Sequence, residues 1–161
     1  MSHCHGLVVG TVLLHAGRVA VAIRQKFPRF LAPSAGHVEP SDGLGEASFT
    51  QAARDAARLA AVRELAEETG FDCGSLPVMS HFTHQATDPC GKSRPDGGPG
   101  GNHLWYVFAH VLSTEPELRD EPSKMHDWRF VPYNELMADD RLEPIWREML
   151  PRVSGLVRQS A

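Results

Sequence analysis

The alternation of apolar and polar residues near the N-terminus predicts a β-hairpin. GLVVGTVLL at 6–14 is rich in β-branched and aliphatic residues and is typical of a buried strand. HAGR at 15–18 has the composition of a turn, and VAVAIR at 19–24 is expected to be the returning strand. Proline and glycine interrupt the segment 25–43, which favours loop with at most one short strand.

The pattern changes near Gly45, where a helical segment begins. From there the chain is dense in Ala, Leu, Glu and Arg and has no proline before Gly70. This composition indicates one helix, or a short helix leading into a long one. Glycine commonly follows the last residue of a helix, so we expect the helix to end just before Gly70.

Three glutamates lie together near the end of this helix. At roughly 100° per residue, Glu64, Glu67 and Glu68 share an arc of about 100° that faces outward. The residues predicted to point towards a core are Val62, Leu65 and Ala66. Each pair of like charges costs a few tenths of a kcal/mol, and this end of the helix dipole disfavours anions. The cluster is therefore either a solvated helix surface or a site for a hard divalent cation.

The second half of the chain alternates strands with helices. We expect strands near 78–86, 103–112 and 126–132, a helix from 133 to 140, and a final amphipathic helix over 142–150. The segment 87–102 is rich in glycine and proline and predicts a mobile loop. Residues 1–5 and 151–161 are candidates for mobile tails. This order of elements predicts a mixed α/β sandwich.

Length and composition limit the classes of protein that the chain can be. A chain of 161 residues favours one domain over 1–161, and its longest apolar runs are too short to span a bilayer. The N-terminus lacks the features of a signal peptide, so we expect a cytoplasmic protein that does not bind membranes. A net charge of -4 argues against a nucleic-acid polymer as partner. The three cysteines are expected to be reduced thiols.

Histidines and cysteines suggest metal binding only weakly. The HCH stretch at His3–His5 can bind a transition metal, but at a chain terminus a solvated tail is the favoured interpretation. The spacing of five further histidines does not match a zinc site. These histidines are His81, His84, His103, His110 and His126.

The helix carries a recognisable motif. RELAEETGF at 63–71 matches the second half of the Nudix box, with Phe71 where an aliphatic residue is usual. SAGHVEPSD at 34–42 resembles the loop before the Nudix helix, in which an acid follows a glycine by six positions, as Asp42 follows Gly36. On these residues the chain is identified as a member of the Nudix (MutT-type) hydrolases, and the resemblance extends over most of its length.

The box differs from the family pattern by an insertion. Seven residues usually separate the first acid from the arginine, whereas twenty separate Asp42 from Arg63. With seven residues left between the acid and Arg63, the acid would be Asp55, and Phe49 would stand where the glycine should be. We prefer Asp42 as the equivalent acid, with 43–55 inserted, and Asp55 remains the alternative.

The resemblance implies a fold, a cofactor and a set of ligands. The fold is a Nudix-type α/β/α sandwich with a mixed central sheet, and the cofactor is Mg2+ or Mn2+. By analogy with the family, Glu67 and Glu68 are metal ligands, Glu64 is a ligand or the base that orients water, and the carbonyl of Gly36 completes the shell. These acids are the expected catalytic residues, together with Arg63.

Other residues receive supporting roles. Arg63 is expected to pair with a helix glutamate or with Asp42. A catalytic base often comes from a separate loop in this family, and the candidates are Glu121 and the acids of the 87–102 loop.

Aromatic residues are candidates for contacts with the part of the substrate that is not phosphate. Trp105 and Tyr106 are adjacent on one strand and must face opposite sides. Trp105 is a candidate for stacking, although core packing is the simpler interpretation. His37, Phe27 and Phe30 are further substrate-binding candidates. Two tryptophans are assigned to the core, Trp128 and Trp146.

The resemblance implies hydrolysis of a nucleoside diphosphate linked to another group. The first choice is an ordinary or oxidised nucleoside triphosphate, cleaved to the monophosphate and pyrophosphate, because DEPSKMHDWRFVPYNEL at 120–136 resembles a segment of enzymes with such substrates. ADP-ribose or a nucleotide sugar is the alternative, and a prenyl or other non-nucleoside diphosphate remains open. A non-catalytic binding module is disfavoured because all three glutamates are present, and an isomerase relative because no cysteine is suitably placed. We expect a monomer or homodimer that binds a small molecule.

Overall fold

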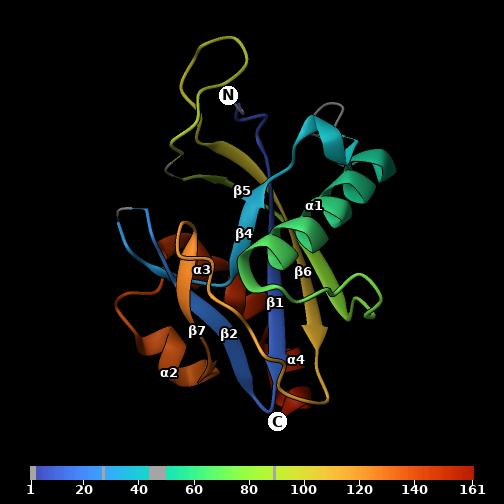
Figure 1. The fold of residues 1–161 in the computed structure, drawn as a ribbon, viewed down its shortest axis with the longest axis vertical. Coiled ribbons are helices and arrows are strands. Elements are labelled where there is room, and N and C mark those ends of the chain that lie inside the picture. Colours follow the sequence, from blue (N-terminus) through green and yellow to red (C-terminus); the bar gives the residue numbers. More distant parts are fainter. Residues whose placement is uncertain (1–2, 27, 44–49, 89) are drawn as a thin grey trace.

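The computed structural model describes residues 3–26, 28–43, 50–88 and 90–161. It confirms the mixed α/β architecture that the sequence predicts, and each predicted strand is present (Figure 1). The strands are β1 (Leu7–His15), β2 (Arg18–Arg24), β3 (Leu31–Ala32), β4 (Ser34–His37), β5 (Ser80–Thr87), β6 (Asn102–Val111) and β7 (Met125–Pro132).

These seven strands form one mixed sheet in the described part of the chain. β1 pairs in parallel with β6 along one edge. On its other edge it pairs antiparallel first with β4 and then with β2. β2 also pairs with β3 and β7, and β5 pairs with β6, all antiparallel. Because β1 is bordered on both sides, it is buried along almost its whole length.

Helices cover both faces of the sheet (Figure 1). The α-helices are α1 (Gln51–Thr69), α2 (Tyr133–Ala138), α3 (Pro144–Met149) and α4 (Ser154–Ser160). Two 3-10 turns complete the set, η1 (Pro40–Asp42) and η2 (Leu150–Val153). None of the helices in the described ranges is long and apolar enough to cross a bilayer.

Side-chain alternation along β6 assigns each residue to one of two cores. Tyr106 and Phe108 belong to the cluster that includes the buried alanines of α1. Trp105 and Val107 belong to the cluster that includes Trp146 and the C-terminal helices. The prediction that Trp105 and Tyr106 face opposite sides is therefore confirmed.

The ends of α1 explain why the helix stops where it does. The Thr50 hydroxyl accepts a hydrogen bond from the backbone N–H of Ala53 at 3.2 Å. Gly70 has a left-handed φ of 74° and donates its N–H to the carbonyl of Ala66 at 2.8 Å, as expected for a C-terminal glycine. The observed helix begins at Gln51, and residues 44–49, part of the predicted helical stretch and of the insertion, lie outside the described residues.

The C-terminal segment differs from its prediction. Residues 150–160, most of which were expected in a tail, form η2 and α4 instead. Leu150, Val153 and Val157 are buried and follow a helical spacing that continues past Pro151. Proline is tolerated in the first turn of a helix, so Pro151 does not end the helical region.

Candidate active site

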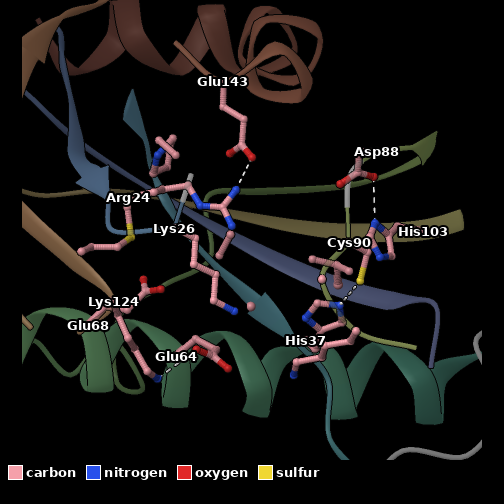
Figure 2. Close-up of a pocket in the computed structure, with 18 of the residues that line it drawn as sticks. Arg24, Lys26, His37, Glu64, Glu68, Asp88, Cys90, His103, Lys124 and Glu143 are labelled. Carbon is pink, nitrogen blue, oxygen red and sulfur yellow. Dashed lines mark hydrogen bonds and ion pairs between the residues drawn. The ribbon is translucent and has the colours of Figure 1, made fainter. Parts of the chain in front are cut away.

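A cavity of about 260 Å3 lies between α1, β4, β7 and the segment that joins β5 to β6. Figure 2 shows acidic and basic side chains pointing into it from several elements. Its charged and titratable lining residues are Arg24, Lys26, His37, Glu64, Glu68, Asp88, Cys90, Lys92, His103, Lys124 and Glu143. Four of these are lysines or arginines, so the cavity combines carboxylates with cations that suit an anionic ligand.

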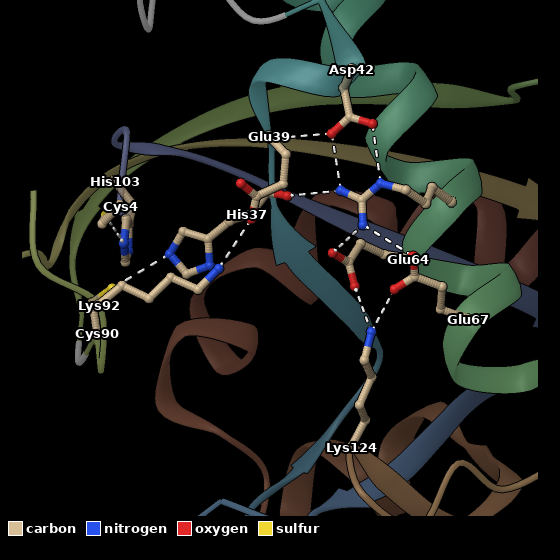
Figure 3. Close-up of polar contacts among 11 residues, drawn as sticks. Cys4, His37, Glu39, Asp42, Glu64, Glu67, Cys90, Lys92, His103 and Lys124 are labelled. Atoms are coloured by element: carbon tan, nitrogen blue, oxygen red, sulfur yellow. Dashed lines mark hydrogen bonds and ion pairs between the residues drawn. The ribbon is translucent and has the colours of Figure 1, made fainter. Parts of the chain in front are cut away.

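Arg63 connects α1 to the segment that follows β4. Its Nε and Nη2 donate to the two carboxylate oxygens of Asp42 at 3.1 and 2.9 Å, and Nη2 also donates to the His37 carbonyl at 3.2 Å (Figure 3). Nη1 donates to Glu64 Oε1 at 2.8 Å. Burial raises the pKa of Asp42, but the hydrogen bonds from Arg63 and from the backbone N–H of Glu39, together with the charge of Arg63, outweigh burial and hold the pKa below its usual value. Arg63 therefore fixes the position of the loop relative to the helix.

The two acids considered for the first position of the box have different surroundings. Asp42 is buried and carries the paired contact with Arg63. Asp55 is exposed and accepts a hydrogen bond from the side chain of Gln51 at 2.7 Å, one turn earlier on α1. The contact geometry thus favours Asp42, which is the last residue of η1 and directly precedes the insertion 43–55.

The three glutamates, which we call the carboxylate site, do not share one outward face as predicted. Glu67 is exposed, Glu64 is half-buried, and Glu68 is only 4% exposed. Ala66, predicted to face the core, is exposed. The prediction was wrong because it centred the polar arc on Glu64, whereas α1 is rotated so that Glu68 turns towards the sheet.

Burial and nearby polar groups shift the pKa values of these carboxyls. Burial raises the pKa of Glu68 to about 8 against the opposing effect of the nearby Ser34 hydroxyl, and the carboxyl of Glu64 adds to the shift. Burial also raises the pKa of Glu64, against the opposing effects of Arg63 and Lys124. The hydrogen bond from Lys124 lowers the pKa of Glu67.

Lys124 is a site residue that our sequence interpretation missed. Its ammonium lies 2.5 Å from Glu67 Oε2 and 3.7 Å from Glu64 Oε2. The residue falls in the segment 120–136, which we considered only as an indication of substrate. Its position beside two carboxylates shows that this part of the cavity already accommodates a positive charge.

Two observations indicate that a divalent cation fits the carboxylate site. Glu68 Oε2 is buried and has no hydrogen-bond partner among the described residues, so it is available as an oxygen ligand. A Cβ placed on Gly36 would lie 2.2 Å from the carboxyl carbon of Glu64, so only glycine lets the strand approach this carboxylate so closely. Glu64, Glu68 and the backbone at Gly36 therefore surround a space suited to a hard cation.

The predicted substrate-binding residues are only partly brought together. His37 and Trp105 line the cavity, and burial together with the charge of Lys92 lowers the pKa of His37 to about 4. Trp105 is also buried in the core, where it packs edge-on against Trp146 with ring centroids 5.7 Å apart. Phe30 is not among the residues that line the cavity, and Phe27 lies outside the described residues.

Other predicted residues have structural contacts. The carboxylate of Glu121 accepts hydrogen bonds from the backbone and hydroxyl of Ser123, and Glu121 does not line the cavity. Trp128 is half-buried, and its Nε1 donates to the carbonyl of Glu68 at 3.2 Å, which supports the end of α1. Of the two acids in the 87–102 loop, Asp88 lines the cavity and Asp96 is exposed.

The structure also assembles a group that the sequence did not suggest. Cys4, His37, Cys90 and His103 offer sulfur and nitrogen atoms that all lie within 4.8 Å of one another. Our sequence interpretation considered His103 and rejected a zinc site, because its partners come from distant parts of the sequence, and it considered Cys4 only within the HCH stretch. We call these four residues the thiol–imidazole group.

Comparisons with known proteins identify the architecture. The model of the NUDIX domain family matches residues 5–153. A comparison with curated protein sequences gives no match.

Solved structures resemble the whole chain. A Caenorhabditis elegans Ap4A hydrolase, in a binary complex, has 17% identity and a TM-score of 0.67, covering 95% of this chain and 98% of its own. An Escherichia coli dihydroneopterin triphosphate pyrophosphohydrolase has 15% identity and a TM-score of 0.63, covering 90% of this chain and 91% of its own.

A third structure is a bifunctional NMN adenylyltransferase/ADP ribose pyrophosphatase from Francisella tularensis, complexed with AMP and a manganese ion. It has 14% identity and a TM-score of 0.67, over 98% of this chain and 43% of its own. At these identities the likeness concerns the fold.

Proposed function

This chain belongs to the NUDIX domain family and is a hydrolase of phosphoanhydride bonds, and from this premise we propose a substrate class and roles for its residues. The proposed reaction converts a nucleoside triphosphate, ordinary or oxidised, to the monophosphate and pyrophosphate. The proposed cofactor is Mg2+ or Mn2+, and the proposed location is the cytoplasm.

The observation that carries this proposal is the buried carboxyl of Glu68. Its Oε2 atom has no hydrogen-bond partner among the described residues, although an unpaired buried polar group is costly. A divalent cation would remove this cost by accepting the oxygen as a ligand, and it would favour the ionised form of a carboxyl whose pKa is otherwise about 8.

Each residue of the carboxylate site has a proposed role. Glu67 and Glu68 are the metal ligands, Glu64 is a ligand or orients the attacking water, and the carbonyl of Gly36 completes the shell. When bound, the divalent ion would neutralise phosphate charge and lower the pKa of a water molecule. Arg63 acts as a positioning residue, because its bonds to Asp42 and Glu64 fix the helix against the loop.

The cationic residues of the cavity have a complementary role. Arg24, Lys26 and Lys92 line its wall. We propose that they contact the phosphate oxygens that the divalent ion does not contact. Lys124 neutralises Glu64 and Glu67 in the absence of metal, and we expect it to turn towards phosphate when metal binds. These residues bind and orient a polyphosphate chain along the carboxylate site.

The remainder of the substrate is expected to contact Trp105 and to lie beside the part of the cavity wall that includes His37. Trp105 is 4% exposed, which leaves its ring too little free surface for full stacking, so we assign it an edge contact. The alternative substrates are ADP-ribose and nucleotide sugars. The similar structures described above are named for Ap4A, dihydroneopterin triphosphate and ADP-ribose, and all of these contain phosphoanhydride bonds.

The proposal is tested by measuring phosphate release from a panel of such compounds with Mg2+ and with Mn2+. We expect Glu67→Gln to lose on the order of 100-fold or more in rate, because a metal ligand is removed. Glu117→Gln makes the same chemical change at an exposed residue that belongs neither to α1 nor to the cavity lining, and it is expected to retain the wild-type rate. Equal rates for wild type and Glu67→Gln would refute the assigned role, and nucleotide binding without turnover would identify a binding module.

A further inference from the structure

The thiol–imidazole group is assembled from four places in the chain. Cys4 precedes β1, His37 ends β4, Cys90 lies between β5 and β6, and His103 lies in β6. Figure 3 shows the four side chains turned towards one another beside the cavity. Cys4 and His103 are buried, whereas His37 and Cys90 are half-buried.

The distances within the group match those between ligands of a tetrahedral metal ion. Cys4 Sγ lies 3.4 Å from His103 Nε2, and Cys90 Sγ lies 3.4 Å from His37 Nε2. With Zn–S distances of about 2.3 Å and Zn–N distances of about 2.0–2.1 Å, tetrahedral zinc separates a sulfur ligand from a nitrogen ligand by roughly 3.5 Å. These two sulfur–nitrogen pairs therefore already have the spacing that zinc requires, and all four donor atoms lie within 4.8 Å of one another.

A carboxylate orients one of the imidazoles. His103 Nδ1 lies 2.8 Å from Asp88 Oδ1, which leaves Nε2 directed at Cys4. The same carboxylate oxygen accepts a hydrogen bond from Trp105 Nε1 at 3.3 Å. A carboxylate on the far nitrogen of a histidine fixes the ring and strengthens it as a metal ligand. This contact supplies the outer partner that zinc-bound histidines usually have.

The backbone closes tightly around the two thiols. A Cβ placed on Gly100 would lie 3.0 Å from Cys4 Cβ, 3.1 Å from Cys90 Sγ and 2.3 Å from the carbonyl of Lys92, so this position requires glycine. The backbone N–H of Cys4 donates to the carbonyl of Ser93 at 2.8 Å. The N-terminal segment, predicted as a tail, is thus attached to the loop that carries Cys90.

We propose that Cys4, His37, Cys90 and His103 bind one Zn2+ ion, at a site separate from the carboxylate site. Thiolate and imidazole ligands suit zinc, whereas Mg2+ prefers carboxylate oxygen, so the two sites select different metals. With four protein ligands the zinc site is closed, and its role is structural. It fastens the N-terminal segment and the loop between β5 and β6 to the wall of the cavity.

The test measures metal content in the full-length protein, expressed with added zinc and purified under reducing conditions. We expect one zinc per chain in wild type, and cobalt substitution should give the absorption bands of tetrahedral thiolate coordination. Cys4→Ser and Cys90→Ser should lose the zinc. Cys73→Ser is the matched control, because Cys73 is buried beside Arg58 outside the group, and it should retain one equivalent.

Two further variants keep the test decisive if the cysteine variants do not fold. Asp88→Asn should weaken zinc binding by about 10- to 100-fold, as expected for loss of an outer partner. The double variant Glu67→Gln, Glu68→Gln should keep the zinc. Loss of zinc from this double variant would show that the carboxylates bind the metal instead.

Other outcomes overturn the proposal. Wild type without zinc and without the cobalt spectrum would show that the group does not bind metal. A disulfide between Cys4 and Cys90, detected by mass spectrometry as a single remaining thiol under the same reducing conditions, would give the two sulfurs a different function. Three free thiols after zinc is removed are the result that the proposal requires.

Discussion

The carboxylate site and the thiol–imidazole group contribute to the same cavity, but the chain assembles them differently. Glu64, Glu67 and Glu68 lie within five consecutive positions of one helix. The four residues of the thiol–imidazole group are spread over a hundred positions and meet only because β1, β4 and β6 are neighbours in the sheet. A site built on one helix is visible in the sequence, whereas a site built across a sheet depends on the topology.

The two sites also differ in how they are neutralised in the absence of metal. Lys124 and Arg63 pair with Glu64 and Glu67, but Glu68 Oε2 has no such partner in the described residues. In the thiol–imidazole group, each sulfur already has an imidazole nitrogen as a neighbour. Metal removal should therefore affect the two sites differently.

The largest effect is expected from Glu68→Gln. The variant removes a proposed metal ligand, so turnover should fall on the order of 100-fold or more, while zinc content stays at the wild-type value. The measurement pairs a phosphate-release assay with metal analysis of the same sample. If activity and zinc content fell together, the two sites would not be separate.

Gly36→Ala is expected to reduce turnover by about 10- to 100-fold, because an added Cβ displaces the Glu64 carboxylate and small misplacements in an active site are costly. Steady-state kinetics should show the loss mainly in kcat. Gly155→Ala, in α4, meets only Arg158 at 3.9 Å and serves as the control. A variant of Gly36 with wild-type kcat would show that the close approach of β4 has no functional consequence.

Asp42→Asn should destabilise the protein by about 2 kcal/mol, because the half-buried guanidinium of Arg63 then loses its buried, charged partner. Asp55→Asn, the corresponding change at the rival acid, should lie within about 0.5 kcal/mol of wild type, as is usual for an exposed residue. Chemical denaturation of both variants measures the difference. Equal destabilisation would remove the reason for preferring Asp42.

A separate effect concerns pH. Burial raises the pKa of Glu68 from 4.5 to about 8, so the folded state retains a proton that the unfolded state releases. Without metal, this contribution to stability is fully present below pH 4.5 and is lost as the pH rises through about 8, with a slope of at most about 1.4 kcal/mol per pH unit. Denaturation in the presence of a chelator should show this decrease in stability with rising pH. The Glu68→Gln variant should lack the part of the decrease that Glu68 contributes.

Added Mg2+ should oppose the same trend. Metal binding requires the ionised carboxylate, so Mg2+ should stabilise the protein more at pH 8 than at pH 5. A Mg2+ effect independent of pH would contradict the assignment of Glu68 as a ligand.

Much of the fold could be predicted from local patterns. The hairpin, the central helix with its end at Gly70, and the strand containing Trp105 all follow from periodicity and from glycine placement. The last helical elements, η2 and α4, were missed because residues 151–161 were assigned to a tail, although buried Val153 and Val157 continue the apolar face.

The site was predictable mainly where its residues belong to a recognisable motif. The motif around Arg63 identified the glutamates, but a helical wheel does not fix which way the helix is rotated, so the burial of Glu68 could not be predicted. Lys124 and Cys90 could not be placed because their positions depend on which strands are neighbours in the sheet. Pairing of β1 with both β4 and β6 is the fact that brings His37 and His103 together.

The central claim, that the glutamates of α1 hold a divalent ion, is tested most directly by titrating the zinc-loaded protein with Mn2+ and following free Mn2+ by electron paramagnetic resonance. The account predicts saturable binding in wild type and in Cys73→Ser, and loss of that binding in the double variant Glu67→Gln, Glu68→Gln. Binding of Mn2+ that is equally strong in the double variant would contradict it.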